Sequence, residues 1–561
     1  MYKQGLRSAF ALAALLAIAG CGRKAHDDAP IAFVPADTPY VVASLEAPPE
    51  AVTEGWRRYM QQAWPIMVAM YGPLVDELGN KDESAARVVR ALFDEVRARD
   101  TAEKWRELGF SLQARGAFYG VGLLPVARVE LADADAFRAA VARIEQKAGA
   151  KLGTARIGEQ DVWTFGTAEV VGLMAVEGRH LVFGVLPAAA DDGLKRRVLG
   201  LDRPQRSLAD SGALADLNKA RGYLPYGSGW IDAQRVLALY GTDPGVAALA
   251  RAAGEEPPPA LDATCRGELE ALVRKAPRLA FGYTALDAAH MALHMRLDLE
   301  PALAKALAAL PGALPGTAAK DALFDLAFAL PVLRGRDFLV AQADAVAKAP
   351  FACASLAPLN ASFAEMKDKL DQVIPPPFAD LVGVRAAVDR FSWPDGAQTP
   401  DVGGVLLVGS TNPTFLANLA QVSTPALAQL KLEPNGQPVA IPAEALPGAA
   451  AGLELHAALS AQALGVSIGK DEAPRLSAAM AAAPGTPGTL FELGMSGEVY
   501  RLLADGIGRF ADKIPAEQRS QIEGSQQLYA LYAQWIRRIE MRGALTAEGL
   551  DVTETVDFAQ P

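Results

Sequence analysis

Residues 277–299, PRLAFGYTALDAAHMALHMRLDL, decide the fold class because apolar and polar side chains alternate along their second half. From position 291 onward every second residue is a methionine or a leucine. A period of two predicts a β-strand with one buried and one solvated face, which is typical of antiparallel sheets. The apolar set is Met291, Leu293, Met295, Leu297 and Leu299, and the opposite set is His290, Ala292, His294, Arg296 and Asp298.

Other segments repeat their apolar residues every three to four positions, as amphipathic helices do. The clearest runs from Trp56 to Leu74, and Pro65 should kink it or start a new helix. Residues 84–108 and 363–374 also predict helices. Strands and helices together predict an α+β fold in which antiparallel sheets pack with helices.

One phrase occurs twice in the chain, as PYVVASLEAPP at 39–49 and as PFACASLAPLN at 350–360. With three further pairs of similar segments in the same order, it predicts two similar lobes in tandem. Lobe 1 is residues 31–300, lobe 2 is residues 346–561, and residues 301–345 form a helical connector. Cys353 would then lie in the first strand of lobe 2; the alternative is chance resemblance between alanine-rich segments. The further pairs are 120–126 with 403–408, 230–237 with 491–500, and 277–299 with 537–558.

The first twenty residues are predicted to be a secretory signal peptide. Lys3 and Arg7 form a positive region, and the apolar run at 8–19 is too short to span a bilayer.

The sequence Ile-Ala-Gly-Cys at 18–21 resembles the lipobox of bacterial lipoproteins. The resemblance implies cleavage after residue 20, acylation of Cys21 with chains such as palmitate, and a lipidated tether over residues 21–30. Gly22 follows the cysteine in place of aspartate, which in that family implies the outer membrane. The alternative is an ordinary signal peptide with a chance cysteine.

Composition describes a globular protein with more than one domain. The chain has 561 residues, of which 51% are hydrophobic and 21% are charged. Its formal net charge of −11 becomes about −13 once Lys3 and Arg7 leave with the signal. This acidic balance argues against nucleic acid as a partner.

Three cysteines are present, and lipidation of Cys21 would leave Cys265 and Cys353. In an oxidising compartment two remaining cysteines are predicted to pair. The bond would close a loop of 88 residues and contribute about 4–5 kcal/mol by chain entropy. Two unpaired buried cysteines are the alternative.

No catalytic, metal or cofactor site is predicted. His290 and His294 have the spacing of a helical zinc pair, but on a strand they lie roughly 13 Å apart. Ser467 and Lys470 match S-x-x-K, yet the sequence lacks the other two elements of the serine acyl-enzyme pattern. Walker and dinucleotide fingerprints are absent from the sequence.

The segment at 56–78 concentrates aromatic residues and methionine, which suit adaptable apolar surfaces as well as ordinary cores. It is a candidate apolar groove for a lipid, a glycan or a partner helix. The candidate residues are Trp56, Met60, Trp64, Met67 and Tyr71.

The stretch FVPADTPYVVASLE at 33–46 resembles the start of bacterial envelope proteins of unknown function. The resemblance carries over no active site. We therefore expect a lipid-anchored lipoprotein of the bacterial cell envelope, with a periplasmic body on the outer membrane and a non-enzymatic binding or scaffolding role. Its partners would be the membrane, through the anchor, and an envelope protein or apolar ligand. The alternatives are a periplasmic carrier of a lipid or other apolar ligand, and a hydrolase with an unrecognised site.

Overall fold

The computed structural model describes residues 28–79, 84–252, 254–257, 260–376, 378–394, 400–424, 427–442, 453–510 and 516–559. The α+β class is confirmed, and the strands pair antiparallel. The chain divides into two compact units: unit 1 is Met1–Met295 with Ala504–Leu531, and unit 2 is Arg296–Leu503 with Tyr532–Pro561. The predicted signal peptide and Cys21 lie outside the described residues.

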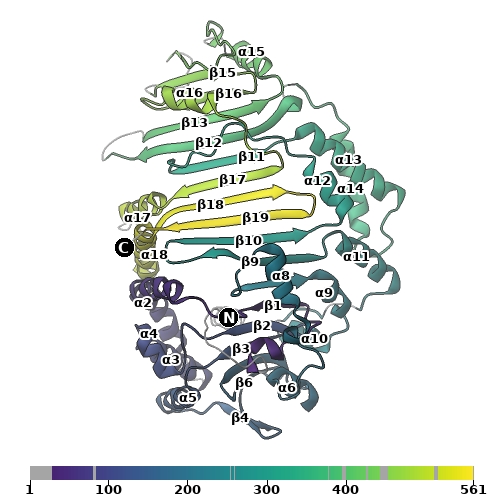
Figure 1. Ribbon diagram of the computed structural model, residues 1–561, viewed down its shortest axis with the longest axis vertical. Helices are drawn as coiled ribbons and strands as arrows, with labels where there is room; N and C mark the ends of the chain where they lie inside the picture. The colour runs from purple at the N-terminus through teal and green to yellow at the C-terminus, as the bar shows by residue number, and fades with distance from the viewer. Residues whose placement is uncertain are drawn as a thin grey trace. The chain divides into compact units, whose positions relative to one another are not determined.

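The sheet of unit 1 has the strand order β4-β5-β6-β7-β3-β2-β1-β8-β9-β10, with β1 paired to both β2 and β8 (Figure 1). The hairpin predicted at 277–299 is confirmed as β9 and β10. The strands are β1 (Tyr40–Ala43), β2 (Gly116–Val121), β3 (Leu124–Glu130), β4 (Gly153–Ile157), β5 (Gln160–Gly166), β6 (Val170–Glu177), β7 (His180–Pro187), β8 (Ser228–Asp232), β9 (Arg278–Leu286) and β10 (His290–Asp298), which runs past the end of the unit.

Helices cover both faces of this sheet. Val198 and Leu199 of α6 enter the main core with Val41, Val126 and Val182. On the other face α5 packs through an apolar stripe against β6 and β7. The helices of unit 1 are α2 (Glu50–Gly79), α3 (Ser84–Arg97), α4 (Ala102–Trp105), α5 (Ala134–Ala148), α6 (Asp192–Leu199), α7 (Leu208–Ser211), α8 (Ala213–Arg221), α9 (Ala233–Leu239), α10 (Pro244–Ala252), α11 (Ala263–Lys275) and most of α18 (Ala516–Trp535), with the 3-10 helices η3 (Pro30–Phe33) and η4 (Arg106–Leu108).

The sheet of unit 2 has the strand order β14-β15-β16-β13-β12-β11-β17-β18-β19, with β11 paired to both β12 and β17 (Figure 1). Its strands are β11 (Phe324–Ala329), β12 (Leu381–Ser392), β13 (Asp401–Ser410), β14 (Val439–Ala440), β15 (Leu455–Leu459), β16 (Ala463–Ile468), β17 (Thr489–Ser496), β18 (Ile536–Leu545) and β19 (Gly549–Phe558).

The core of unit 2 lies on one face of its sheet. Leu476 of α16 packs with Leu407 and Val405 of β13, and Leu314 packs with Ala327 of β11. The helices of this unit are α12 (Pro301–Ala308), α13 (Val332–Lys348), α14 (Ala357–Leu370), α15 (Pro413–Ser423), α16 (Ala473–Ala481) and the first part of α17 (Glu498–Phe510), with the 3-10 helix η5 (Phe378–Asp380).

The predicted helices are present with different ends. α2 continues through Pro65, so no new helix starts there. The segment 84–108 is interrupted after Arg97, and α4 begins where the Thr101 side chain accepts a hydrogen bond from the N–H of Lys104. This N-cap gives the chain a local reason to restart the helix.

The expected strand around Cys353 is wrong. Residues 351–353 are irregular and lead into α14, whose first turn contains Pro358. The Asn360 side chain bonds the backbone of Phe351 twice, through N–H to Oδ1 at 2.9 Å and Nδ2 to O at 2.9 Å. Because the Asn360 side chain occupies both backbone groups of Phe351, this residue is not paired in a β-sheet. The strand that pairs with β12 and β17 is β11, which lies inside the expected helical connector.

Candidate binding surface

The predicted groove residues all lie on α2 of unit 1, and they do not share one environment. Trp56 and Tyr71 are exposed at 43% and 50%, whereas Met60, Trp64 and Met67 are half-buried. The structure therefore spreads these side chains over an exposed side and a packed side of the helix.

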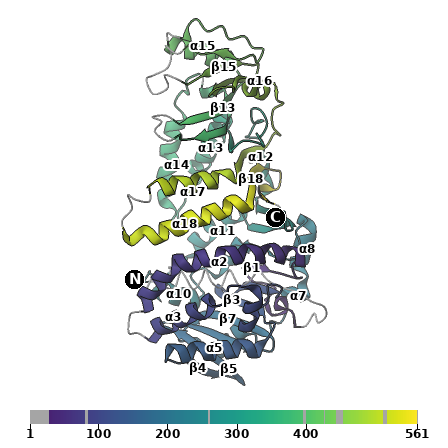
Figure 2. The same cartoon turned by 90° about the vertical axis from the view of Figure 1, so that its left-hand side faces the viewer.

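Two contacts explain the packed side of α2. The Trp64 ring meets Trp105 edge-on, with 5.6 Å between centroids, and its Nε1 donates to the carbonyl of Arg97 at 3.4 Å. Further along α2, the Met70 side chain lies over Gly524 of α18. A Cβ added to Gly524 would lie 2.1 Å from Met70 Cγ. Figure 2 shows α18 beside α2. Part of this stripe is thus ordinary helix packing.

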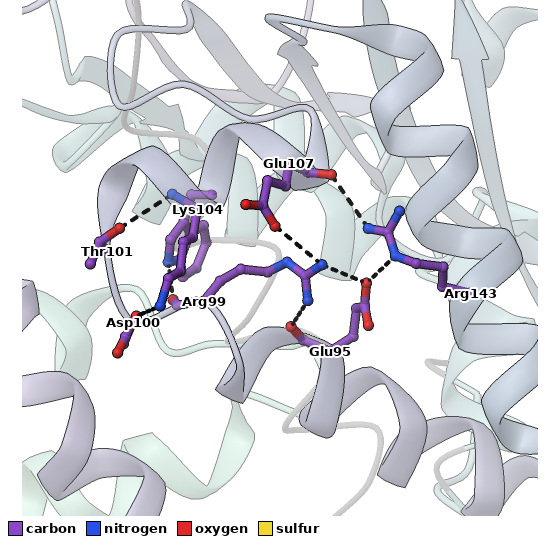
Figure 3. Close-up of polar contacts among 8 residues, drawn as sticks. Glu95, Arg99, Asp100, Thr101, Lys104, Glu107 and Arg143 are labelled. Carbon is purple, nitrogen blue, oxygen red and sulfur yellow. Dashed lines mark hydrogen bonds and ion pairs between the residues drawn. The ribbon is translucent and has the colours of Figure 1, made fainter.

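The neighbouring acidic residues of α3 and η4 are held in ion pairs (Figure 3). The buried carboxylate of Glu95 accepts from Arg143 Nε at 2.6 Å and meets Arg99 Nη2 at 3.1 Å. Arg99 also approaches Glu107 at 3.5 Å. Because two guanidinium groups share Glu95, this network holds α3, η4 and α5 together and offers no carboxylate poised for acid–base chemistry.

The first described residues pack into unit 1 around a buried arginine. Arg128 of β3 is fully buried and donates to Glu177 Oε2 at 2.7 Å. The Phe33 ring lies between the guanidinium carbons of Arg128 and Arg203, which are 3.5 and 3.6 Å from its centroid. Ala29 and Pro30, the last two residues of the expected tether, are also buried.

His180 completes this cluster as a neutral imidazole. Its Nδ1 lies 3.2 Å from Arg128 Nη1, and a guanidinium can only donate, so Nδ1 accepts and the proton is on Nε2. Burial, reinforced by the charge of Arg128, lowers the pKa of His180 from 6.5 to about 4.

Cys265, in the first turn of α11, and Cys353 are joined in a disulfide, so the predicted pairing is confirmed.

The two residues of the S-x-x-K match lie in different environments. Ser467 is fully buried in β16, whereas Lys470 is exposed beyond the end of that strand. The structure thus gives the S-x-x-K match no accessible nucleophile.

The described histidines and acidic residues are not arranged as a metal site. His290 and His294 both lie in β10, and His294 Nδ1 is 3.0 Å from the hydroxyl of Tyr223. Over the described ranges, no group of three or more His, Cys, Asp or Glu side chains is arranged to hold a metal ion.

Three charged side chains in the middle of the unit 2 sheet lie on one face, which we call the covered face. Asp325 of β11, Arg385 of β12 and Glu492 of β17 point to the side on which α16 packs. Arg385 donates to Asp325 Oδ1 at 2.7 Å and to Glu492 Oε2 at 2.5 Å, and its Nε donates to the carbonyl of Pro315 at 2.9 Å. Desolvation raises the pKa of Asp325 although Arg385 opposes it.

Residues 311–322, the covering segment, lie over these charges. Arg538 of β18 donates to the carbonyls of Ala319 and Ala322, each at 3.2 Å, and Leu314 is fully buried against Ala327. The charged side of the sheet is therefore the protected side.

On the opposite face, which we call the apolar face, the register-paired residues of β16, β13, β12, β11, β17 and β18 include no charged side chain. Strand register places its side chains in three rows of six. The rows are Leu464, Val408, Val384, Phe328, Phe491 and Gly543; Val466, Leu406, Ala386, Leu326, Leu493 and Met541; and Ile468, Gly404, Val388, Phe324, Met495 and Ile539.

The covered face holds both the apolar core and the buried ion pairs. A sheet face that is left to solvent is usually polar, whereas here the exposed face is apolar. Near the middle of the apolar face Phe328 and Leu406 are 42% and 44% exposed, and the other large side chains on it are half-buried. Exposed contiguous apolar surface on a folded protein marks a site of interaction. The apolar face of unit 2 is the candidate binding surface.

Sequence reasoning missed this surface. Its signal is the short runs FDLAFA at 324–329 and VLLV at 405–408, but which residues share a face depends on strand pairing. A separate hollow of about 220 Å³ near α16 is lined by Asn435, Gln437, Ser460 and Ser477 among others, and offers no comparable apolar area.

Across the residues that the structure describes, no helix has the length and apolar character needed to cross a membrane. No protein-family model, no curated protein and no solved structure matches this chain.

Proposed function

We propose that this chain is a lipid-anchored protein of the bacterial cell envelope that acts by binding through the apolar face of unit 2, without catalysis. One observation carries the binding role: the charged side of this sheet is covered by the chain's own covering segment and α16, while the uncharged side exposes Phe328 and Leu406. Hydrophobic burial favours covering an apolar face, so an external ligand or partner is expected on this one.

We also propose that the chain consists of two similar lobes in tandem. In unit 1, β1 pairs with β2 and β8; in unit 2, β11 pairs with β12 and β17. The order of the remaining shared strands also agrees, β6-β7-β3 in one and β15-β16-β13 in the other. The matching orders support a second lobe that begins before β11, near residue 311.

Anchorage rests on the signal peptide and on Cys21. Cells that express the full chain and are fed radioactive palmitate should label it, and Cys21→Ser should abolish the label. A labelled Cys21→Ser protein would contradict lipidation at this residue.

The binding role is tested by photo-crosslinking in intact cells. A benzophenone amino acid replaces Leu406 or Phe328, and the control replaces Asp401, an exposed residue at the start of β13. The proposal predicts protein or lipid adducts at Leu406 and Phe328 that are absent at Asp401. Adducts at none of the three positions would contradict it.

A further inference from the structure

We infer that the occupant of the apolar face is the acyl chain of a lipid. This inference rests on the proposed binding role and names its ligand class. It begins from the three rows of side chains, which contain no charged group and no N–H or O–H donor.

The backbone of the apolar face also offers no hydrogen-bonding group to an occupant. The N–H and C=O groups of the six strands pair with neighbouring strands, so they point within the sheet and not out of it. Protein interfaces carry about one hydrogen bond per 100–200 Å², and this face offers none. An occupant complementary to it has no polar group along its contact length, as a hydrocarbon chain does.

The dimensions suit an extended chain. Six strands spaced about 4.8 Å apart make each row about 24 Å long, which is of the order of an extended fatty acyl chain. In the middle row the small side chain of Ala386 lies between the larger side chains of Leu406 on β13 and Leu326 on β11. A chain that follows this row passes over Ala386, its smallest side chain, and over Leu406, and lies beside Phe328 of the neighbouring row. Leu406 and Phe328 are the two most exposed side chains of the apolar face.

The test is a fluorescence titration of Gly22–Pro561 with cis-parinaric acid, a fatty acid that brightens in apolar surroundings. We expect saturable binding to the wild-type protein. Leu406→Asp places a carboxylate in the middle row and should weaken binding by about tenfold or more. The matched control is Val373→Asp, which changes an apolar residue that is 86% exposed and lies between α14 and η5; it should leave the affinity within about twofold of wild type.

A second variant keeps the test decisive if Leu406→Asp does not fold. Ala386→Trp leaves the face apolar but fills the middle row, and it should also weaken the binding of cis-parinaric acid. Absence of saturable binding to the wild type, or equal affinity in wild type, Leu406→Asp and Ala386→Trp, would overturn the inference.

Failure of this inference is distinguishable from failure of the proposed function. If crosslinking at Leu406 yields only protein adducts and cis-parinaric acid does not bind, the acyl chain is wrong and the binding role stands. If crosslinking yields no adduct at Leu406 or Phe328, the binding role itself is wrong.

Discussion

At the scale of single residues, His180 shows how a buried polar cluster couples the fold to pH. Its ring packs edge-on against Phe33 at 5.4 Å, and its Nδ1 accepts from Arg128. Protonation would place two cations side by side in a site from which water is excluded. The native state of unit 1 therefore binds this proton less readily than the unfolded chain does.

The predicted consequence is a loss of stability in acid. Because the folded pKa of His180, about 4, lies below the unfolded value of 6.5, its contribution is complete above pH 6.5 and declines as the pH falls toward 4. The total is roughly 3 kcal/mol. Urea unfolding of Gly22–Pro561 at several pH values should show a steeper decline for wild type than for His180→Gln. Parallel declines would contradict this assignment.

Arg385 should be the most sensitive single residue in unit 2. Arg385→Met leaves Asp325 and Glu492 without their shared guanidinium, and loss of one partner from a buried ion pair costs about 3–5 kcal/mol. Adding Asp325→Asn should restore part of that loss, because burial already raises the pKa of this carboxyl group. Urea unfolding of the single and double variants measures the difference; a double variant less stable than Arg385→Met would contradict the account.

At the scale of elements, the periodicity of apolar residues predicts a helix or hairpin correctly where the structure depends on that segment alone. Alternation at 277–299 predicts the β9–β10 hairpin, and the spacing from Trp56 predicts α2. The phrase at 350–360 misleads because its Pro358 and Asn360 start a helix and tie its first turn. β11 escapes prediction because its six residues have no polar alternation except Asp325, which is buried in an ion pair.

Helix ends provide a matched pair of glycines for testing backbone strain. Gly109 ends η4 at φ +82, and Gly149 ends α5 at φ +59. A Cβ on Gly109 would lie 2.3 Å from the carbonyl oxygen of Asp133, whereas nothing lies within 4 Å at Gly149. Gly149→Ala should cost about 1–2 kcal/mol from the left-handed backbone alone, and Gly109→Ala should cost clearly more. Equal losses in urea unfolding would show that the contact at Gly109 relaxes freely.

At the scale of the whole molecule, the disulfide is the long-range link that sequence reasoning did find. Only Cys265 and Cys353 remain in Gly22–Pro561, and thiol labelling after denaturation without reductant should detect neither. Cys265→Ser, Cys353→Ser and the double variant should lose the same stability, up to about 4–5 kcal/mol. Two labelled thiols in the wild-type protein would contradict the bond.

The candidate site could not be predicted in the same way, because it is a property of strand register. Phe328 and Phe491 face each other on β11 and β17, although more than 160 residues separate them. The ion pairs of Arg385 likewise join three strands that are distant in sequence. Each short apolar run reads as an ordinary core strand until the covering segment is known to lie on the charged side.

The central claim is that the apolar face of unit 2 carries an apolar ligand, and native mass spectrometry tests it most directly. Gly22–Pro561 and its Leu406→Asp variant would be purified gently from a periplasm. The account predicts a stoichiometric added mass of a lipid on the wild-type protein, lost on denaturation and much reduced in Leu406→Asp. A bare polypeptide mass for the wild type, or the same added mass on Leu406→Asp, would contradict it.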